Sequence, residues 1–501
     1  MRKKVFSILI AVVMVLAITP LSVFADVDTS DYLAYEIIDG EVTVVGCNES
    51  INGDFLIPGT IEGYPVTKIA DSAFMGCREI KSISIPDSVI EIGMGAFADC
   101  EGLETVVISD GVAKICDSTF QGCTGLKNVT IGSNVTEIGF SAFHYCTALE
   151  NIVIPAGVES IGVEAFSLCF NLKSIEVDEN NKYFSSSKDG VLFNKDKTAI
   201  IFYPIGNSRT EYSIPDSVES IEFAAFYFAS NLEKITIPDS VENIGGGAFA
   251  GCYRLEEIII PDSVTSTIGE QTFVQCINLK TVIIGNGVTG IEENAFLDCP
   301  VIENVTIGEN VKFIGKKAFW SNFGNICLES ITIPKSVEIV DAEAFFCCNA
   351  LKKINIYNPE MLIAEDSFYM VGVLDWDRYS SLVTEIYSSA LIDQEQNTDE
   401  LLAELLTLVY QIPDDELKDA VIYGYTGSTA EIYANENNMM FKELGEKITP
   451  DEEEDTTVPE IPKDDEEADS ETDFIGMIIK MFEKIIDFFT KIFSSLMNLF
   501  A

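Results

Sequence analysis

The chain has 501 residues, of which 81 are Asp or Glu and 31 are Lys or Arg, so its formal net charge is −50 at pH 7. A polypeptide with this charge repels the phosphate backbone of nucleic acids and anionic membrane surfaces, which excludes nucleic-acid binding as a function. The length accommodates two or three ordinary domains, or one repeat domain that grows by adding units.

Residues 1–25 have the pattern of a secretory signal peptide. Three basic residues, Arg2 to Lys4, precede an apolar run from Val5 to Ile18, and Val23-Phe24-Ala25 has the small-x-small form of a cleavage site. We therefore expect the mature chain to begin at Asp26 and the protein to be secreted. The alternative is an uncleaved N-terminal anchor.

Phenylalanine recurs at a nearly fixed interval through the next part of the chain. The steps are 23 to 26 residues, except for one step of 60 residues. A period of this length is the sequence signature of a solenoid, in which each repeat stacks on its neighbours. The repeat phenylalanines are Phe74, Phe97, Phe120, Phe143, Phe166, Phe226, Phe249, Phe273, Phe296, Phe319, Phe345 and Phe368.

The aligned unit has the form L-x-x-I-x-I-P-x-x-V-x-x-I-G-x-x-A-F-x-x-C, as in residues 149–169. Its I-x-I piece predicts a short parallel strand, which the proline ends because it cannot donate the next ladder hydrogen bond. The I-G pair predicts a tight corner, and A-F-x-x-C predicts a helical or 3-10 turn. One unit has too few apolar residues to fold alone, so stacked units must bury the Leu, Ile, Val and Phe columns.

This unit resembles the repeat of the BspA-like leucine-rich repeat proteins of bacterial surfaces, which carry the same I-P, I-G and A-F-x-x-C marks. The resemblance covers roughly residues 55–371, and we place the solenoid at 66–371. Gly63-Tyr64-Pro65-Val66 resembles the family's entry unit, so we place an N-terminal cap at residues 26–65, and Tyr425–Ala430 resembles the family's closing segment. The resemblance implies a leucine-rich-repeat solenoid, mainly parallel β with short helical or 3-10 turns, and adhesion to host matrix proteins or to other cells.

The 60-residue step from Phe166 to Phe226 exceeds one period by 37 residues and predicts an insertion at about residues 178–212. Within it, Val191–Phe193 and Ala199–Tyr203 flank four polar residues, the pattern of a β-hairpin. Such an insertion lies on one rim of a solenoid, where it either shapes a binding surface or is a tolerated surface excursion.

Nine of the 13 cysteines lie three residues after a repeat phenylalanine. Stacked units would place neighbouring copies about 4.8 Å apart, which permits disulfides, but the side chains would all point the same way in a tight turn. We therefore expect a ladder of buried thiols that pack as small hydrophobic groups. A zinc site is not indicated, because the spacing is 23 residues instead of C-x2-C pairs. These cysteines are Cys77, Cys100, Cys123, Cys146, Cys169, Cys252, Cys276, Cys299 and Cys348.

The sequence offers little for catalysis. His144 is the only histidine and lies inside a repeat turn, so any Ser-His-Asp or Cys-His arrangement would depend on it. The phosphate-binding G-x-x-x-x-G-K-[ST], the metalloprotease H-E-x-x-H and the nucleophile motif G-x-S-x-G are absent. We expect no enzymatic activity, no cofactor and no bound metal.

The second and fourth residues after each repeat leucine are expected to face outward from a continuous sheet. In this acidic chain that strip is nearly neutral and rich in β-branched residues, which suggests a contact surface for a protein or glycan ligand. The alternative is that these residues are present for strand propensity alone. The candidate binding strip consists of Val107, Thr130, Val153, Thr236, Ile259, Ile283 and Thr306.

The first residue after the repeat leucine alternates between Lys and Glu in successive units. Lys81, Glu104, Lys127, Glu150 and Lys173 follow this order. Opposite charges on adjacent strands attract, so this column predicts a stabilising ladder of ion pairs and no binding site.

The period stops after Phe368, and residues 372–448 are expected to form a C-terminal cap over the last apolar cross-section. Thr398–Gln411 has helical spacing of leucines, and Ser428–Glu431 has the S-x-x-E form of a helix capping box. Residues 449–473 are strongly acidic and predict a disordered linker.

Residues 474–501 predict an amphipathic helix, because the charged and polar residues among Phe474–Phe500 fall on one narrow helical stripe. Five charges argue against a simple membrane span. The helix is expected to lie in a membrane interface or contact the envelope, to self-associate, or to dock on the solenoid itself.

The sequence therefore predicts a secreted or cell-surface binding protein that uses its solenoid surface for adhesion. The alternative is a structural component of the envelope, tethered or oligomerised by its C-terminal helix and without a host ligand.

Overall fold

The computed structural model describes residues 32–48, 51–321, 327–364, 366–368, 420–437 and 439–444. The signal peptide, the helix expected at 398–411, the acidic linker and the C-terminal amphipathic helix lie outside the described residues. The chain divides into two units, Met1–Gly445 and Glu446–Ala501, and all described residues belong to the first. Within the described residues, no helix combines the length and apolar character that a membrane span requires.

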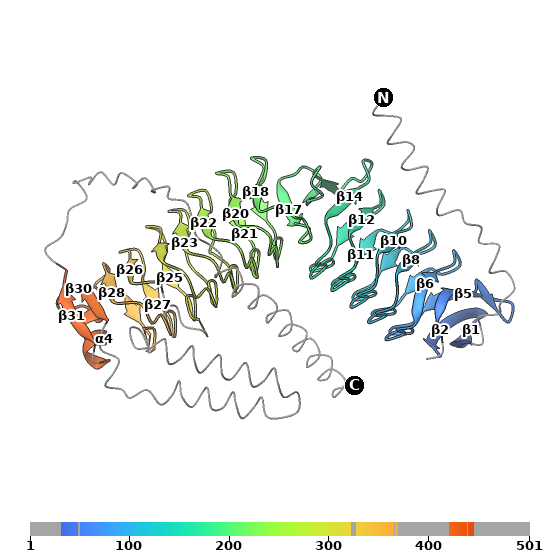
Figure 1. Ribbon diagram of the computed structural model, residues 1–501, viewed down its shortest axis with the longest axis horizontal. Coiled ribbons are helices and arrows are strands. Elements are labelled where there is room, and N and C mark those ends of the chain that lie inside the picture. The colour runs from blue at the N-terminus through green and yellow to red at the C-terminus, as the bar shows by residue number, and fades with distance from the viewer. Residues whose placement is uncertain are drawn as a thin grey trace, which may run out of the picture. The chain divides into compact units, whose positions relative to one another are not determined.

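The first unit is a solenoid whose coils follow one another in chain order (Figure 1). Each regular coil contributes a longer strand from its I-x-I piece and a two-residue strand before its glycine, and each kind of strand pairs in parallel with its counterpart one coil away. In the longer ladder, for example, Thr105 pairs with Ser82 on one side and with Asn128 on the other. The two ladders confirm the parallel β solenoid that the period predicts.

The longer strands are β6 (Ile80–Ser84), β8 (Thr105–Val107), β10 (Asn128–Thr130), β12 (Asn151–Ile154), β14 (Ser174–Val177), β18 (Glu211–Ser213), β20 (Lys234–Thr236), β22 (Glu257–Ile260), β23 (Thr281–Ile284), β24 (Asn304–Thr306), β26 (Ser330–Ile333) and β28 (Lys353–Ile356). The two-residue strands are β7 (Glu91–Ile92), β9 (Lys114–Ile115), β11 (Glu137–Ile138), β13 (Ser160–Ile161), β19 (Ser220–Ile221), β21 (Asn243–Ile244), β25 (Phe313–Ile314), β27 (Ile339–Val340) and β29 (Leu362–Ile363).

The segment around each repeat phenylalanine is a turn with a repeating hydrogen-bond pattern. Around Phe143, the N–H groups of Ser141, Phe143 and Tyr145 donate to carbonyls of the next coil at 2.8 to 3.2 Å. The intervening N–H groups close local i→i+3 bonds, the type found in 3-10 helices. Ser141 and Tyr145 have positive φ angles of 52° and 60°, which turns alternate N–H groups toward the neighbouring coil and prevents a regular helix.

The phenylalanine rings stack along the interior. Adjacent rings from Phe74 to Phe166 lie 5.0 to 5.8 Å apart between centroids and within 20° of parallel. The rings are essentially buried, so replacing one of them with Ala would cost roughly 3 to 5 kcal/mol of unfolding free energy.

In the units that carry it, the glycine of the I-G pair allows coils to approach closely at this corner. A Cβ on Gly162 would lie 2.4 Å from the backbone nitrogen of Phe140, and one on Gly245 would lie 2.5 Å from that of Phe223. A side chain at Gly162 or Gly245 would therefore push its coil away from the preceding one, whereas other units, such as those of Glu222 and Glu292, accommodate a side chain at this position.

Three strands fill the long step: β15 (Phe184–Ser186), β16 (Leu192–Asn194) and β17 (Ala199–Phe202). β16 and β17 form an antiparallel hairpin, and β17 pairs in parallel with β19. Tyr203 then takes the place of a repeat phenylalanine, since its N–H donates to Ala225 O and its ring stacks on Phe226 at 5.1 Å. Tyr203 precedes Phe226 by 23 residues, so the long step contains one regular coil and one coil extended by 14 residues. The phenylalanine spacing missed this coil because its aromatic residue is tyrosine.

The thiol ladder is present for eight of the nine repeat cysteines. Each of them is buried and donates its S–H to the carbonyl of the repeat phenylalanine one coil earlier, as Cys100 does to Phe74 (3.0 Å) and Cys146 to Phe120 (3.2 Å). The other six are Cys123, Cys169, Cys252, Cys276, Cys299 and Cys348. Burial raises the pKa of the Cys146 thiol well above its usual range and that of Cys252 to about 12.

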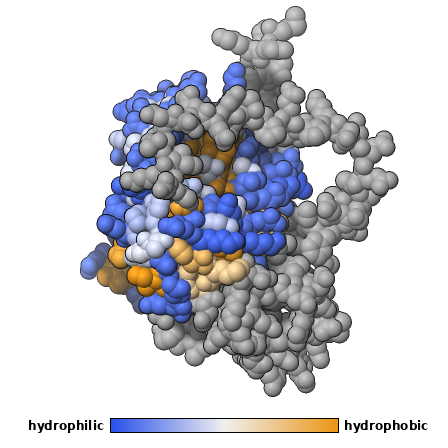
Figure 2. Space-filling view, turned by 90° about the vertical axis from the view of Figure 1, so that its left-hand side faces the viewer, coloured by the Kyte–Doolittle hydropathy of each residue, from blue (hydrophilic) through white to orange (hydrophobic). Residues whose placement is uncertain are grey.

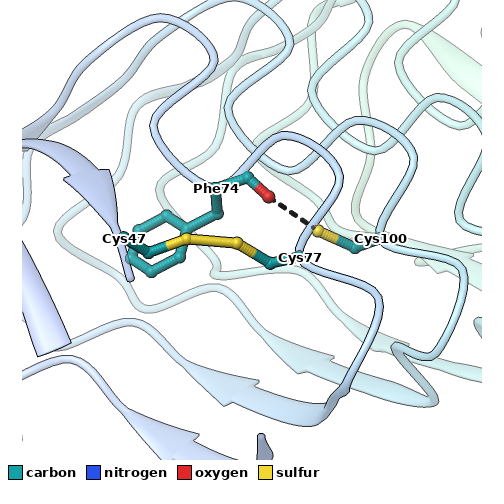
Figure 3. Close-up of a disulfide and its surroundings, with 4 residues drawn as sticks. All are labelled: Cys47, Phe74, Cys77 and Cys100. Carbon is teal, nitrogen blue, oxygen red and sulfur yellow. Dashed lines mark hydrogen bonds between the residues drawn. A yellow bond between two sulfur atoms is a disulfide. The ribbon is translucent and has the colours of Figure 1, made fainter. Parts of the chain in front are cut away.

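The prediction was wrong for Cys77, which forms a disulfide with Cys47 (Figure 3). Cys77 belongs to the first coil, so it has no earlier repeat phenylalanine to donate to, and it bonds instead to Cys47 at the end of β2. Cys100 one coil later makes the regular bond to Phe74 O. The disulfide therefore joins the N-terminal strands to the first coil.

The N-terminal strands are β1 (Leu33–Ile38), β2 (Glu41–Cys47), β3 (Gly53–Leu56), β4 (Thr60–Ile61) and β5 (Tyr64–Ile69). β1 and β2 form an antiparallel hairpin, while β5 pairs with β7 and β3 with β6. These strands start both ladders of the solenoid.

At the other end, β30 (Val421–Gly424) pairs with β28 and with β31 (Met440–Glu443), and α4 (Thr429–Glu436) lies between β30 and β31 in sequence. The expected capping box is present: Ser428 Oγ accepts from Glu431 N–H at 3.3 Å, and the Glu431 carboxylate accepts from Gly427 N–H at 2.6 Å. Tyr433 packs edge-on against Phe368, and its hydroxyl oxygen accepts from the Phe368 N–H at 3.2 Å.

Figure 2 views this end of the solenoid and shows apolar residues among hydrophilic ones. The described apolar side chains here include Leu362, Ile432 and Met440, which are 62%, 52% and 48% exposed. The cap thus closes the aromatic stack but presents apolar side chains of its own.

The thiol ladder predicts which cysteines react with a thiol reagent. Eleven cysteines lie outside the disulfide, and among them Cys116 and Cys327 alone are not buried. We expect Ellman's reagent to modify at most two thiols rapidly in the native protein, 11 after denaturation without reductant, and 13 after denaturation and reduction. Buried thiols react slowly because burial disfavours the thiolate.

A C116S variant should lose one of the rapidly reacting thiols, which serves as the control. Rapid modification of four or more thiols in the native protein would contradict the ladder.

Candidate binding surface

The seven strip residues lie on the longer strands with their side chains outward. Val107 lies on β8, Thr130 on β10, Val153 on β12, Thr236 on β20, Ile259 on β22, Ile283 on β23 and Thr306 on β24. Their neighbours in each strand point inward and are mostly buried, which is the alternation of a strand with one covered face. Val107, Val153 and Ile259 are 39%, 54% and 49% exposed, and Ile283 is partly exposed.

The sequence predicts one continuous sheet along the strip. The structure instead divides the strands of the strip among separate sheets. β8 and β10 belong to one sheet, β12 pairs with β14, and β20 to β24 belong to another sheet. The extended coil causes the break after β14, because the next partner of that strand is the insertion: the Ile175 N–H donates to Gly190 O at 3.0 Å. The structure therefore brings together Val107 with Thr130, and Thr236 with Ile259, Ile283 and Thr306, as two groups on either side of the insertion.

Within the second group, Ile259 and Ile283 are direct partners in the register of β22 and β23, and Ile283 is in turn the partner of Thr306. Cross-strand neighbours of this kind place their side chains side by side on one face. Two isoleucines and a threonine thus form a small apolar surface on adjacent strands.

In the coils before the insertion, the outward polar residues two positions after the repeat leucine bond to one another or to Asp54. Ser82 Oγ donates to Asp54 at 2.6 Å, Ser174 Oγ donates to Asn151 at 2.8 Å, and Asn128 contacts Thr105 at 3.5 Å. Because these groups satisfy each other, the apolar and threonine side chains at the fourth position are the part of the strip best placed to contact a ligand.

The predicted charge ladder is present in two of its steps. Lys127 pairs with Glu104 and Lys173 pairs with Glu150, each at 2.8 Å. The hydrogen bond from Lys127 lowers the pKa of the Glu104 carboxyl. Lys81 instead approaches the carbonyl of Gly102 at 3.5 Å. All these side chains are about half exposed, and exposed ion pairs contribute little to stability, so the ladder neutralises charge beside the strip more than it holds the coils together.

His144 lies largely buried in its repeat turn, and its Nδ1 atom has no hydrogen-bond partner. Burial lowers the pKa of His144 to about 4, so the ring is neutral at pH 7. Among the described residues, no carboxylate that would orient a catalytic imidazole is hydrogen-bonded to its Nδ1 atom. Across the described ranges, no group of three or more His, Cys, Asp or Glu side chains is arranged to hold a metal ion.

A family comparison matches residues 67–188, 201–324 and 321–406 to the BspA type leucine rich repeat region, over more than half of the chain. The chain belongs to this family. Its members are repeat proteins that are generally non-enzymatic, and membership indicates a protein-binding or cell-surface role.

Solved structures similar to this BspA-type protein are bacterial leucine-rich repeat proteins. The pneumococcal vaccine antigen PcpA is 21% identical, with a TM-score of 0.52 over 83% of this chain and 98% of that one. A leucine-rich repeat protein from Bacteroides ovatus is 25% identical, with a TM-score of 0.48 over 83% and 98% of the two chains. A leucine rich cell surface protein from Faecalibacterium prausnitzii is 24% identical, with a TM-score of 0.37 over 68% and 90%. The likeness to PcpA is one of fold alone. The search of curated proteins finds no match.

Sequence reasoning missed one region of this BspA-type protein, where the extended coil interrupts the stack of turns. Phe140, Val163 and Phe223 flank the interruption and are about half exposed. They lie three residues before the aromatic residue of their coils, where Asp117, Glu270 and Glu293 occupy other units. That change from acidic to apolar was readable in the sequence, but nothing in it showed that these coils are separated in space.

The single histidine provides a direct test of packing around the repeat turn. We expect the His144 ring resonances in NMR spectra to titrate with a pKa of about 4 in the folded protein and near 6.5 in denaturant. Because the unfolded chain binds the proton more readily, this residue lowers the free energy of unfolding as pH falls from 6.5 to 4, by at most about 3 kcal/mol.

A H144N variant should lack this component of the pH dependence while keeping the contribution of the carboxylates. A folded-state pKa near 6.5 would show that the ring is hydrated and would contradict its burial.

Proposed function

We propose that this protein is secreted or held at the cell surface, where it binds a protein or glycan of the host or of neighbouring cells through its strand face. Family membership supports the surface location and the binding role. The strand face is the part of the solenoid where outward apolar residues repeat from coil to coil, and repeat proteins of this kind bind through extended surfaces.

The observation that carries the proposal is the exposure of apolar side chains on this face of a strongly acidic protein. Val153 and Ile259 keep about half of their surface exposed, although a strand needs no large apolar residue on its solvated side. Apolar residues gathered on adjacent strands and flanked by neutralised charges are typical of the centre of a protein interface, where charged residues are depleted.

Replacing Ile259 and Ile283 with Asp should abolish binding to the ligand and leave the fold intact. Each substitution puts a charge at the centre of the apolar surface, and we expect affinity to fall at least about thirtyfold, equivalent to about 2 kcal/mol. The measurement is surface plasmon resonance of the full mature chain against immobilised extracellular-matrix protein fractions and a glycan array.

The matched control is I339D, because Ile339 is 42% exposed on the short strand β27, away from the strand face. Circular dichroism and thermal unfolding should be the same for all variants. Equal affinity of the I259D/I283D variant and the wild type, or an equal loss in I339D, would overturn the proposed surface.

The alternative role, a structural envelope component held by the C-terminal helix, rests on the amphipathic pattern of residues 474–500. If that helix binds a membrane interface, the full mature chain should float with zwitterionic liposomes in a density gradient, and a chain ending at residue 448 should not. If the full chain stays at the bottom and is an oligomer by light scattering while the shortened chain is a monomer, the helix self-associates instead.

A further inference from the structure

The extended coil opens a cleft of about 400 Å³ in the stack of turns. Residues 161–167 form one wall, residues 222–224 form the other, and β15 to β17 supply the remaining lining. A cleft of this volume is within the range of peptide and small-molecule sites.

One wall carries backbone donors without acceptors. In the four coils from Phe74 to Phe143, the N–H groups of the phenylalanine and of the residues two before and two after it donate to the next coil. In the Phe166 coil, the corresponding groups of Glu164, Phe166 and Leu168 have no partner among the described residues. The extended coil has moved away the carbonyls that would accept them.

In the last coil, which no further repeat coil follows, a corresponding N–H group finds its acceptor in the C-terminal cap. The N–H of Phe368 is bonded to the hydroxyl of Tyr433 from the cap. Backbone N–H groups removed from water need an acceptor, so the groups of Glu164 and Phe166 in the cleft wall, with that of Leu168 directly after it in sequence, favour an external acceptor. Ser167 Oγ is also buried without a partner, on the same wall.

Apolar side chains surround the opening. Val163 and Phe223 line the cleft from opposite walls and are 50% and 53% exposed, and Phe140 on the adjacent coil is 49% exposed. Exposed apolar groups clustered around a cleft mark contact sites, whereas scattered ones do not.

The charge of the cleft is negative. Glu164 and Glu222 line it, and no basic side chain does. Glu164 forms no ion pair with another described residue, and burial raises the pKa of its carboxyl. The occupant that fits carries positive charge beside apolar groups.

We propose that this cleft binds an extended peptide segment of a partner protein, with alternating basic and apolar side chains, whose carbonyls accept from the N–H groups of Glu164, Phe166 and Leu168. The donors occur at alternate residues, and an extended peptide presents carbonyls along one edge at the same interval. Basic side chains pair with Glu164 and Glu222, and apolar side chains contact Val163 and Phe223. This site is separate from the strand face and does not depend on the role proposed for it.

The probe is a fluorescein-labelled hexapeptide of alternating Lys and Val, with a Glu and Val peptide as its counterpart. Anisotropy titrations with the full mature chain, in 150 mM salt to screen distant charge, measure the affinity. We expect the basic peptide to bind and the acidic one not to bind. E222Q and F223S should each weaken binding about tenfold, because each removes a direct contact.

Matched controls occupy the same coil positions where the stack is continuous. Glu292 corresponds to Glu222, and Met94, which is 55% exposed, corresponds to Phe223. E292Q and M94S should bind like the wild type, as should I259D/I283D. Equal weakening in the controls would show that the peptide binds only the general negative charge and would overturn the proposal.

Hydrogen exchange tests the backbone contact directly. On saturation with the basic peptide, the amides of Glu164, Phe166 and Leu168 should exchange at least tenfold more slowly, while those of Ser141 and Tyr145, already bonded to the next coil, should not change. Unchanged exchange at the first three amides, or no peptide binding, would overturn the proposal.

Discussion

The hydrogen bonds between successive repeat turns are the interaction on which the solenoid depends. Every second N–H around the repeat phenylalanine points to the next coil, which requires a left-handed residue on each side of the ring, as at Ser141 and Tyr145. The same turns align the rings about 5 Å apart and bring each cysteine thiol to the phenylalanine carbonyl of the earlier coil. Backbone donors, aromatic rings and thiols are thus satisfied only by a neighbouring coil, so no unit is stable by itself.

That dependence explains what happens where a neighbour is missing. At the N-terminus, the first repeat cysteine forms a disulfide with Cys47, and at the C-terminus Tyr433 supplies both a ring and a hydroxyl to the last coil. At the extended coil, Tyr203 restores the stack on one side, but three N–H groups of the Phe166 coil have no acceptor in the part of the chain that the structure describes. Both ends of the stack are therefore capped, whereas the coil at the internal interruption still has backbone donors that a ligand could bind.

On the strands, the charged residues and the exposed apolar residues occupy different positions. Alternating Lys and Glu pairs lie beside the strand face and neutralise each other, whereas the apolar residues of that face stay exposed. The overall negative charge keeps such a protein soluble despite these apolar groups and favours partners that are neutral or basic at the point of contact. The core residues are nearly the same in every coil. Ligand recognition therefore depends on the outward residues between them, which differ from coil to coil.

The sequence by itself determined the repeat, the parallel solenoid, the inward and outward positions of each strand and the buried thiol column, because these follow from which residues recur every 23 positions. It could not reveal the coil of Tyr203, the disulfide of Cys77 or the break of the strand face after β14. Those depend on how coils of unequal length meet, and a local pattern carries no information on which backbone groups then lose their partners. Only the tertiary structure showed that the N–H groups of Glu164, Phe166 and Leu168 lack acceptors among the described residues, since this comes from the absence of the next coil and not from their side chains.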